Sequence, residues 1–148
     1  MSLRGGIGLP ELPIEDGREF RLGIMGGTFD PIHYGHLVTA EQARESLDLD
    51  AVLFMPAGSP AFKLDKPVTP AEDRYAMTVL ATAANPAFLA SRFEIDRAGV
   101  TYTADTLRAL REFYPPQVKL YFITGADAII DIVTWHHADE IAELATFI

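Results

Sequence analysis

Hydrophobic residues along this chain fall into short continuous runs separated by stretches with helical spacing. The continuous runs are too short for buried helices and read as strands, at residues 22–25, 50–55 and 118–124. Between the first two runs, Leu37, Ala40, Ala43 and Leu47 recur at helical spacing, which predicts a helix from Gly35 to about Leu47. A strand, a helix and a second strand at this spacing predict a right-handed βαβ unit with parallel strands.

Further elements continue the same alternation. A helix is predicted to start after Thr69, whose side chain can cap its N-terminus. Pro70 suits the first helical position, and Glu72 can complete a capping box with Thr69. This helix should run to about Ala84. Thr103 is the expected N-cap of a helix that ends near Phe113. The remaining predictions are a strand within residues 87–96, helices over 126–135 and 138–144, and a strand that starts at 146.

Length, charge and cysteine content restrict the class of protein. The chain has 148 residues, which suits a single domain over residues 21–148, preceded by a flexible leader over residues 1–20. It has no cysteine, which excludes disulfides and thiol–zinc sites and fits a cytoplasmic protein. Neither a signal peptide nor a membrane-length apolar run is present in the sequence. The net charge of −9 disfavours binding to nucleic acid and to anionic membranes. It would also repel any phosphate-bearing ligand, so a divalent cation is an expected partner of such a ligand.

The segment after the first strand carries the clearest chemistry. A strand, a glycine pair (Gly26 and Gly27) and a helix N-terminus form a layout that presents backbone N–H groups to phosphate. The segment lacks the Gly-Lys-Ser/Thr of a Walker A loop and the G-x-G-x-x-G of dinucleotide-binding oxidoreductases. His33 and His36 lie three residues apart, so one helical turn places both imidazoles on one face beside the helix dipole.

The run GGTFDPIHYGH at residues 26–36 resembles the signature of the HxGH nucleotidyltransferases and is most similar to bacterial nicotinate-nucleotide adenylyltransferases. A surface loop with chance histidines is the bland alternative. The resemblance implies a Rossmann-like open parallel sheet with helices on both faces. It also implies transfer of the adenylyl group of ATP to nicotinate mononucleotide, with Mg²⁺ bound through phosphates rather than protein side chains. The residues implied to bind ATP are Gly26, Gly27, Thr28, Phe29, His33 and His36, and His36 is the first choice for transition-state stabilisation.

A proline-rich loop at residues 56–70 carries another family element. Pro60-Ala-Phe-Lys63 resembles the family's Pro-Pro-His-Lys, with Phe62 where the histidine is usual. The resemblance implies that Lys63 contacts ATP phosphate and contributes to catalysis, although a solvated loop lysine is the structural alternative. On the next helix, Arg74 and Met77 also match the family, and we interpret Met77 as core and Arg74 as an ion-pair partner of a nearby acid.

The acceptor side of the site is implied by later motifs. Residues 94–107 resemble the family's E-x-x-R-x-G-x-S-Y-T-x-D-T-L, and Gly125-x-Asp127 resembles its G-x-D element. The residues implied to bind nicotinate mononucleotide are Tyr102, Thr103, Asp127, Trp135 and His136. A structural role at the helix start explains Asp105 and Thr106 fully but Tyr102 and Thr103 less well, and Asp127 could be a helix N-cap as well as a ligand. Core packing is the ordinary role of a lone tryptophan. His136 and His137 do not complete a recognisable metal-ligand spacing with the earlier histidines.

Alternatives within and outside the superfamily stay open. Phosphopantetheine adenylyltransferases and cytidylyltransferases share the His-x-Gly-His loop, whereas the Tyr-Thr, G-x-D and tryptophan elements favour a pyridine nucleotide. The family continues with an I-S-S-T-x-I-R element that has no counterpart here, so we expect a C-terminally incomplete domain. A non-catalytic nucleotide-binding domain is the alternative from another class. A homo-oligomer is compatible with the sequence, which does not define the oligomeric state.

Overall fold

The chain is described here by a computed structural model that covers residues 8–58, 68–97, 103–123 and 146–147. Its strands are β1 (Phe20–Gly27), β2 (Ala51–Pro56), β3 (Phe88–Ala90), β4 (Val118–Ile123) and β5 (Thr146–Phe147). They form a five-stranded sheet of order β3-β2-β1-β4-β5, and every neighbouring pair is parallel. β2 and β3 follow one another on one side of β1, whereas β4 and β5 lie on its other side. The carboxyl ends of β1 and β4 therefore flank a topological switch point.

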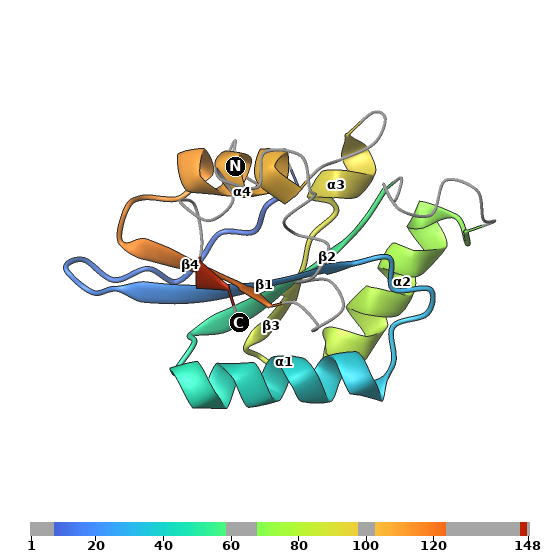
Figure 1. Cartoon of the computed structure of the whole chain (residues 1–148), viewed down its shortest axis with the longest axis horizontal. Coiled ribbons are helices and arrows are strands. Elements are labelled where there is room, and N and C mark those ends of the chain that lie inside the picture. The colour runs from blue at the N-terminus through green and yellow to red at the C-terminus, as the bar shows by residue number, and fades with distance from the viewer. Residues whose placement is uncertain (1–7, 59–67, 98–102, 124–145, 148) are drawn as a thin grey trace.

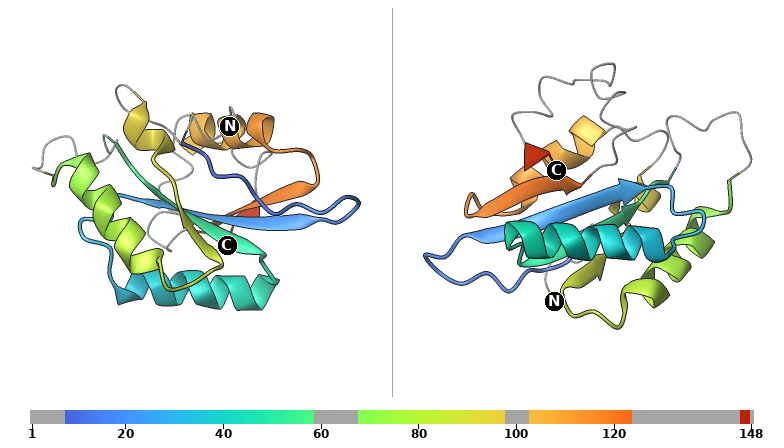
Figure 2. Two further views of the ribbon diagram at one scale, coloured as in Figure 1. Left: turned by 180° about the vertical axis from the view of Figure 1, so that it is seen from behind. Right: turned by 60° about the horizontal axis from the view of Figure 1, so that its bottom comes forward.

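Helices cover both faces of this sheet. They are α1 (Tyr34–Leu47), α2 (Ala71–Thr82), α3 (Phe93–Asp96) and α4 (Thr103–Phe113). α1 and α2 lie on one face, and α3 and α4 lie on the other (Figures 1 and 2). The predicted Rossmann-like sheet with helices on both faces is confirmed. Within the part of the chain that the structure describes, no helix combines the length and hydrophobicity that crossing a membrane requires.

The alternation of side chains along the buried strands builds two cores, one on each face. On one face, Leu22 and Ile24 of β1 pack with Leu107 and Leu110 of α4. On the other face, Met25 packs with residues of α1 and α2, among them Ala40, Ala43, Met77 and Ala81. The core position predicted for Met77 is therefore confirmed. β2 contributes to both cores, and all six of its residues are buried.

Three local predictions are corrected. The glycine pair does not break the first strand, because β1 continues through Gly27, which pairs with Pro56 and whose carbonyl accepts a hydrogen bond from the Ala57 N–H at 2.8 Å. Thr69 does not cap α2: the helix begins one residue after Pro70 with no side-chain cap. Instead, the Thr69 N–H donates to Asp30 Oδ2 at 3.0 Å. α2 also ends at Thr82, before the predicted Ala84.

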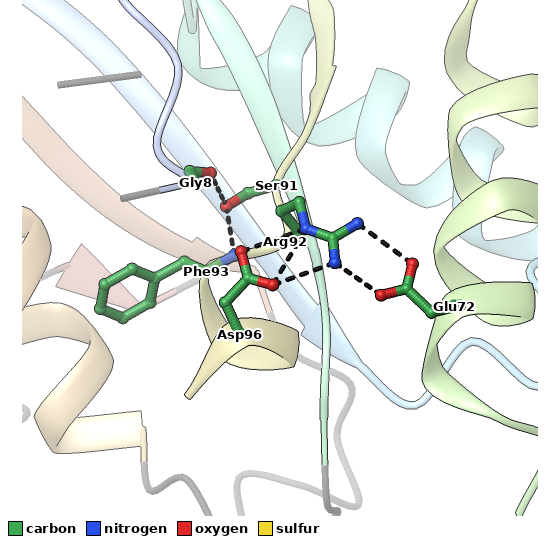
Figure 3. Close-up of polar contacts among 6 residues, drawn as sticks. All are labelled: Gly8, Glu72, Ser91, Arg92, Phe93 and Asp96. Atoms are coloured by element: carbon green, nitrogen blue, oxygen red, sulfur yellow. Dashed lines mark hydrogen bonds and ion pairs between the residues drawn. The ribbon is translucent and has the colours of Figure 1, made fainter. Parts of the chain in front are cut away.

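Part of the expected leader packs against the domain through Leu9, Leu12 and Ile14, whereas residues 15–19 are exposed. Leu9 is only 1% exposed and belongs to the core beside α4. Its neighbours are held by polar contacts. Ser91 Oγ donates to the Gly8 carbonyl at 2.7 Å (Figure 3), and Tyr114 Oη donates to the Pro10 carbonyl at 2.5 Å. Leu9 is a core residue that lies outside any helix or strand. Hydrophobic periodicity does not detect such a residue, because the periodicity arises only in regular structure.

Candidate active site

The loop that joins β1 to α1 lies at the carboxyl edge of the sheet and carries the two histidines. Its second residue, Phe29, has a positive φ of 50°, a conformation that bulky residues rarely adopt. The Phe29 side chain is nevertheless only 3% exposed. Its ring packs edge-on against His36 at 5.0 Å between centroids and also contacts Phe54 at 6.0 Å. The hydrophobic core therefore holds the start of the loop in an otherwise unfavourable backbone conformation.

The two imidazoles cap α1 reciprocally. His33 is the N-cap residue, and its Nδ1 accepts a hydrogen bond from the Gly35 N–H at 3.1 Å. His36 Nδ1 accepts from the His33 N–H at 3.1 Å, and the two rings lie 4.0 Å apart. Because Nδ1 is the acceptor in both rings, the neutral imidazoles carry their hydrogen on Nε2. The predicted placement of the two histidines on one face is confirmed.

The surroundings of His36 favour its neutral form. Burial lowers the pKa of this imidazole, and the neighbouring His33 lowers it further. A neutral His36 with hydrogen on Nε2 is a hydrogen-bond donor at neutral pH. An approaching polyphosphate would raise the pKa of His36 again, because negative charge stabilises the imidazolium.

Arg74 of α2 makes contacts that go beyond its predicted role. Arg74 was predicted to pair with a nearby acid, and the Asp30 carboxylate is close enough to oppose the effect of burial on its pKa. Beyond that prediction, the guanidinium of this residue, which is 1% exposed, donates to main-chain carbonyls. Nε donates to Thr69 at 2.8 Å, Nη1 to Thr28 at 2.9 Å and to Ala57 at 2.5 Å, and Nη2 to Gly58 at 3.0 Å. Burial lowers the pKa of Arg74, and the Asp30 carboxylate acts in the opposite direction.

A buried carboxyl group lies beside the start of α4. Glu94 is half-buried as a residue, but its carboxyl group is enclosed by protein and accepts a hydrogen bond from Thr106 Oγ1 at 2.8 Å. Burial raises the pKa of Glu94 to about 7, while the Thr106 hydrogen bond and Arg97 lower it. Thr106 lies in the first turn of α4, which Thr103 begins. This helix start points to the same edge of the sheet as the start of α1, because both helices begin where parallel strands end.

Seven of the twelve predicted site residues lie in the part of the chain that the structure describes. Gly26 and Gly27 end β1, Thr28 and Phe29 follow in the loop, His33 and His36 meet at the start of α1, and Thr103 begins α4. The other predicted site residues lie outside the described residues: Lys63, with Phe62 beside it, and Tyr102, Asp127, Trp135 and His136. Among the residues that the structure covers, no three His, Cys, Asp or Glu side chains are grouped so that they could hold a metal.

Two features of this edge were not found from the sequence. The hydrogen bonds of Arg74 reach three separate parts of the chain, and no local sequence pattern predicts these bonds. The Glu94–Thr106 contact had a signal, because both residues belong to the family element that the sequence shows at residues 94–107.

Comparison with known proteins decides the family. The cytidylyltransferase-like family model matches residues 24–148. The chain belongs to this family. Within it, the chain is 56% identical over 131 residues to a probable nicotinate-nucleotide adenylyltransferase of Thermoanaerobacter sp., covering 88% of this chain and 62% of that protein. It is 60% identical over 131 residues to the corresponding probable enzyme of Moorella thermoacetica, covering 88% and 60%. The chain thus spans about three fifths of the length of these curated relatives.

Solved structures show that this member of the family has the same fold as more distant proteins. The Plasmodium falciparum nicotinic acid mononucleotide adenylyltransferase complexed with NaAD superposes with a TM-score of 0.74 at 21% identity, covering 87% of this chain and 63% of the other. The same enzyme complexed with APC gives a TM-score of 0.71 at 20% identity, covering 87% and 62%.

Proposed function

We propose that the protein to which this chain belongs transfers the adenylyl group of ATP to nicotinate mononucleotide, forming nicotinate adenine dinucleotide and pyrophosphate. The observation that carries this proposal is the pair of stacked imidazoles at the N-terminus of α1, next to the end of β1. Two relatives at 56% and 60% identity are named as probable nicotinate-nucleotide adenylyltransferases, which supports the acceptor. The chemistry suits a cytoplasmic step of NAD biosynthesis.

The reaction is a direct displacement at phosphorus. A phosphate oxygen of nicotinate mononucleotide forms a bond to the α-phosphorus of ATP, and the bond from that phosphorus to the bridging oxygen of the β-phosphate breaks. The attacking phosphate is already an anion near neutral pH, so no strong general base is needed. Catalysis therefore rests on positioning and on stabilisation of charge on the phosphate oxygens, without a covalent enzyme intermediate.

The histidines are proposed as the donors to that charge. Both present Nε2–H in the neutral form, because Nδ1 of each ring accepts a capping hydrogen bond. The α1 N-terminus adds its dipole to the same region. We assign transition-state stabilisation first to His36, with His33 beside it and Lys63 contributing charge from the loop. Gly26, Gly27, Thr28 and Phe29 would line the nucleotide.

Magnesium enters as part of the Mg-ATP substrate. The described residues at this edge offer imidazoles rather than a set of carboxylates, and imidazole suits Mg²⁺ poorly because this ion prefers oxygen ligands. The phosphate oxygens themselves would bind the ion, which neutralises the leaving pyrophosphate.

The acceptor is proposed to bind near the start of α4. The backbone there would receive the pyridine carboxylate, in the manner of other helix N-termini that bind anions. The residues proposed for this side are Tyr102, Thr103, Asp127, Trp135 and His136, with Trp135 stacking on the pyridine ring.

The proposal is tested by His36→Ala in the whole gene product, assayed with Mg-ATP and nicotinate mononucleotide. Removal of one transition-state donor costs on the order of 10² to 10³ in rate, and we expect a loss of kcat of at least that size. Gln42→Ala is the matched control, because this residue is exposed on the same helix. A near-normal kcat in His36→Ala would exclude the assigned role.

A further inference from the structure

Arg74 joins three segments that are distant in sequence. Its guanidinium hydrogen-bonds the carbonyl of Thr28 in the loop after β1, those of Ala57 and Gly58 after β2, and that of Thr69 before α2. Four of the five N–H donors that a guanidinium offers can thus be assigned to main-chain oxygens. Since the residue is 1% exposed, these bonds are made with little competition from water.

The bond to Thr28 bears on the histidine pair. A trans peptide unit is planar, so fixing the Thr28 carbonyl also fixes the direction of the following Phe29 N–H. Phe29 is the residue with φ of 50°, and its ring lies edge-on against His36. A residue in a sparsely populated backbone region stays there only when its surroundings over-determine it. Arg74 supplies one of these restraints from the backbone side, and the core supplies the other.

The bonds to Ala57 and Gly58 extend the same restraint toward α4. A Cβ on Gly58 would lie 2.5 Å from the Glu94 carbonyl oxygen, so the end of β2 passes α3 without room for a side chain. Glu94 in turn accepts the hydrogen bond from Thr106 in the first turn of α4. The starts of α1 and α4, the two helices assigned to ATP and to the acceptor, are thereby connected through Arg74.

We propose that Arg74 is a positioning residue for adenylyl transfer: it holds the backbone around Thr28 so that the Phe29 ring keeps His36 in its reactive position. The inference rests on the proposed function. Arg74 acts through Phe29 and His36 and makes no contact with the reacting phosphates in this account. A lysine keeps the charge but not the planar fork of donors, so it cannot reproduce four hydrogen bonds in these directions.

The first test is Arg74→Lys in the whole gene product, with kcat and KM for ATP measured separately. A misplacement of about 1 Å costs on the order of 10² in rate, so we expect kcat to fall by about 10- to 100-fold with a smaller change in KM. The matched control is Arg92→Lys. Arg92 also ties the first turn of α2 to α3, through Glu72 and Asp96, but does so from the surface (Figure 3). It should keep kcat within about twofold, as expected for exposed ion pairs.

A second readout does not depend on catalysis. The pKa of His36 is lowered by burial and by His33, so loosening of the Phe29 ring should raise it toward the ordinary histidine value. NMR titration of the imidazoles, assigned by comparison with His36→Ala, measures this in wild type, Arg74→Lys and Arg92→Lys. Only Arg74→Lys should change. A folded Arg74→Lys protein with unchanged His36 titration, or with unchanged kcat, overturns the inference.

These two readouts separate the inference from the proposed function. If the wild-type protein forms no dinucleotide, the proposed function fails, and the His36 titration alone decides the role of Arg74. If Arg74→Lys does not fold, wild-type protein is titrated with the α,β-methylene analogue of ATP, and the Arg74 Nε–H and His36 signals are followed. A joint response with one apparent Kd supports the coupling. A shift of His36 with no response of Arg74 overturns it.

Discussion

The carboxyl group of Glu94 makes the stability of this protein depend on pH in an unusual direction. Burial raises the pKa of Glu94 from the ordinary 4.5 to about 7. Between these two values the folded state binds more protons than the unfolded state, so the free energy of unfolding falls as the pH rises. The stabilisation is fully present below pH 4.5 and is lost as the pH passes 7.

The size of this effect follows from the same two values. Each pKa step is worth about 1.4 kcal/mol, so ionising Glu94 in the folded state costs about 3 kcal/mol, of which about 2 to 3 kcal/mol falls between pH 5 and pH 8. Glu94→Gln removes the ionisation and keeps an acceptor for Thr106 Oγ1, which donates at 2.8 Å. The variant should therefore match wild type in acid and exceed its stability above pH 7.

Urea unfolding of wild type and Glu94→Gln at pH 5 and pH 8 measures the difference directly. The wild-type free energy of unfolding should fall relative to the variant by about 2 to 3 kcal/mol between these pH values. Glu112→Gln on α4 is the matched control, because Glu112 is exposed. A wild type and a Glu94→Gln variant that change in parallel, within about 0.5 kcal/mol, would refute the burial of this carboxyl group.

Two further predictions concern packing. Leu9→Ala should lower the free energy of unfolding by about 2 to 5 kcal/mol, because Leu9 is 1% exposed within the core beside α4. Urea unfolding measures this loss, with Glu11→Ala at an exposed position as the control. Equal stabilities of the two variants would show that Leu9 is not part of the core. Gly23→Ala should cost about 1 to 3 kcal/mol, because its Cβ would lie 2.9 Å from Leu49 Cδ1 and 3.1 Å from Ile123 Cδ1. Gly26→Ala is the control by thermal unfolding, since a Cβ there would lie 3.8 Å from the Phe122 ring. An equal loss in both variants would contradict the steric explanation.

The parts of this fold that follow from sequence are those set by local patterns. All six residues of β2 are buried, and in β4 only Lys119 is exposed, so their nearly continuous hydrophobic runs indicate both strands. The placement of His33 and His36 on one face depends on a spacing of three residues, which the sequence displays directly, whereas their reciprocal capping was not predicted. Residues three apart at a helix start are neighbours on the helix surface, so this contact needs no distant segment of the chain.

The parts that did not follow are those in which distant segments compete for the same group. Thr69 looked like a helix cap, but the Asp30 carboxylate, 39 residues earlier, takes its N–H. Gly27 looked like a turn residue, but its pairing with Pro56 keeps it in the sheet. Arg74 looked like one half of an ion pair, and its carbonyl partners come from three segments that only the folded chain brings together.

The central claim is tested most directly by identifying the product that the whole gene product forms. Mg-ATP is incubated with nicotinate mononucleotide, nicotinamide mononucleotide or phosphopantetheine, and products are identified by mass together with pyrophosphate release. We expect nicotinate adenine dinucleotide with equimolar pyrophosphate, and little product with phosphopantetheine. Formation of dephospho-coenzyme A as the main product, or no product from any acceptor, would contradict it.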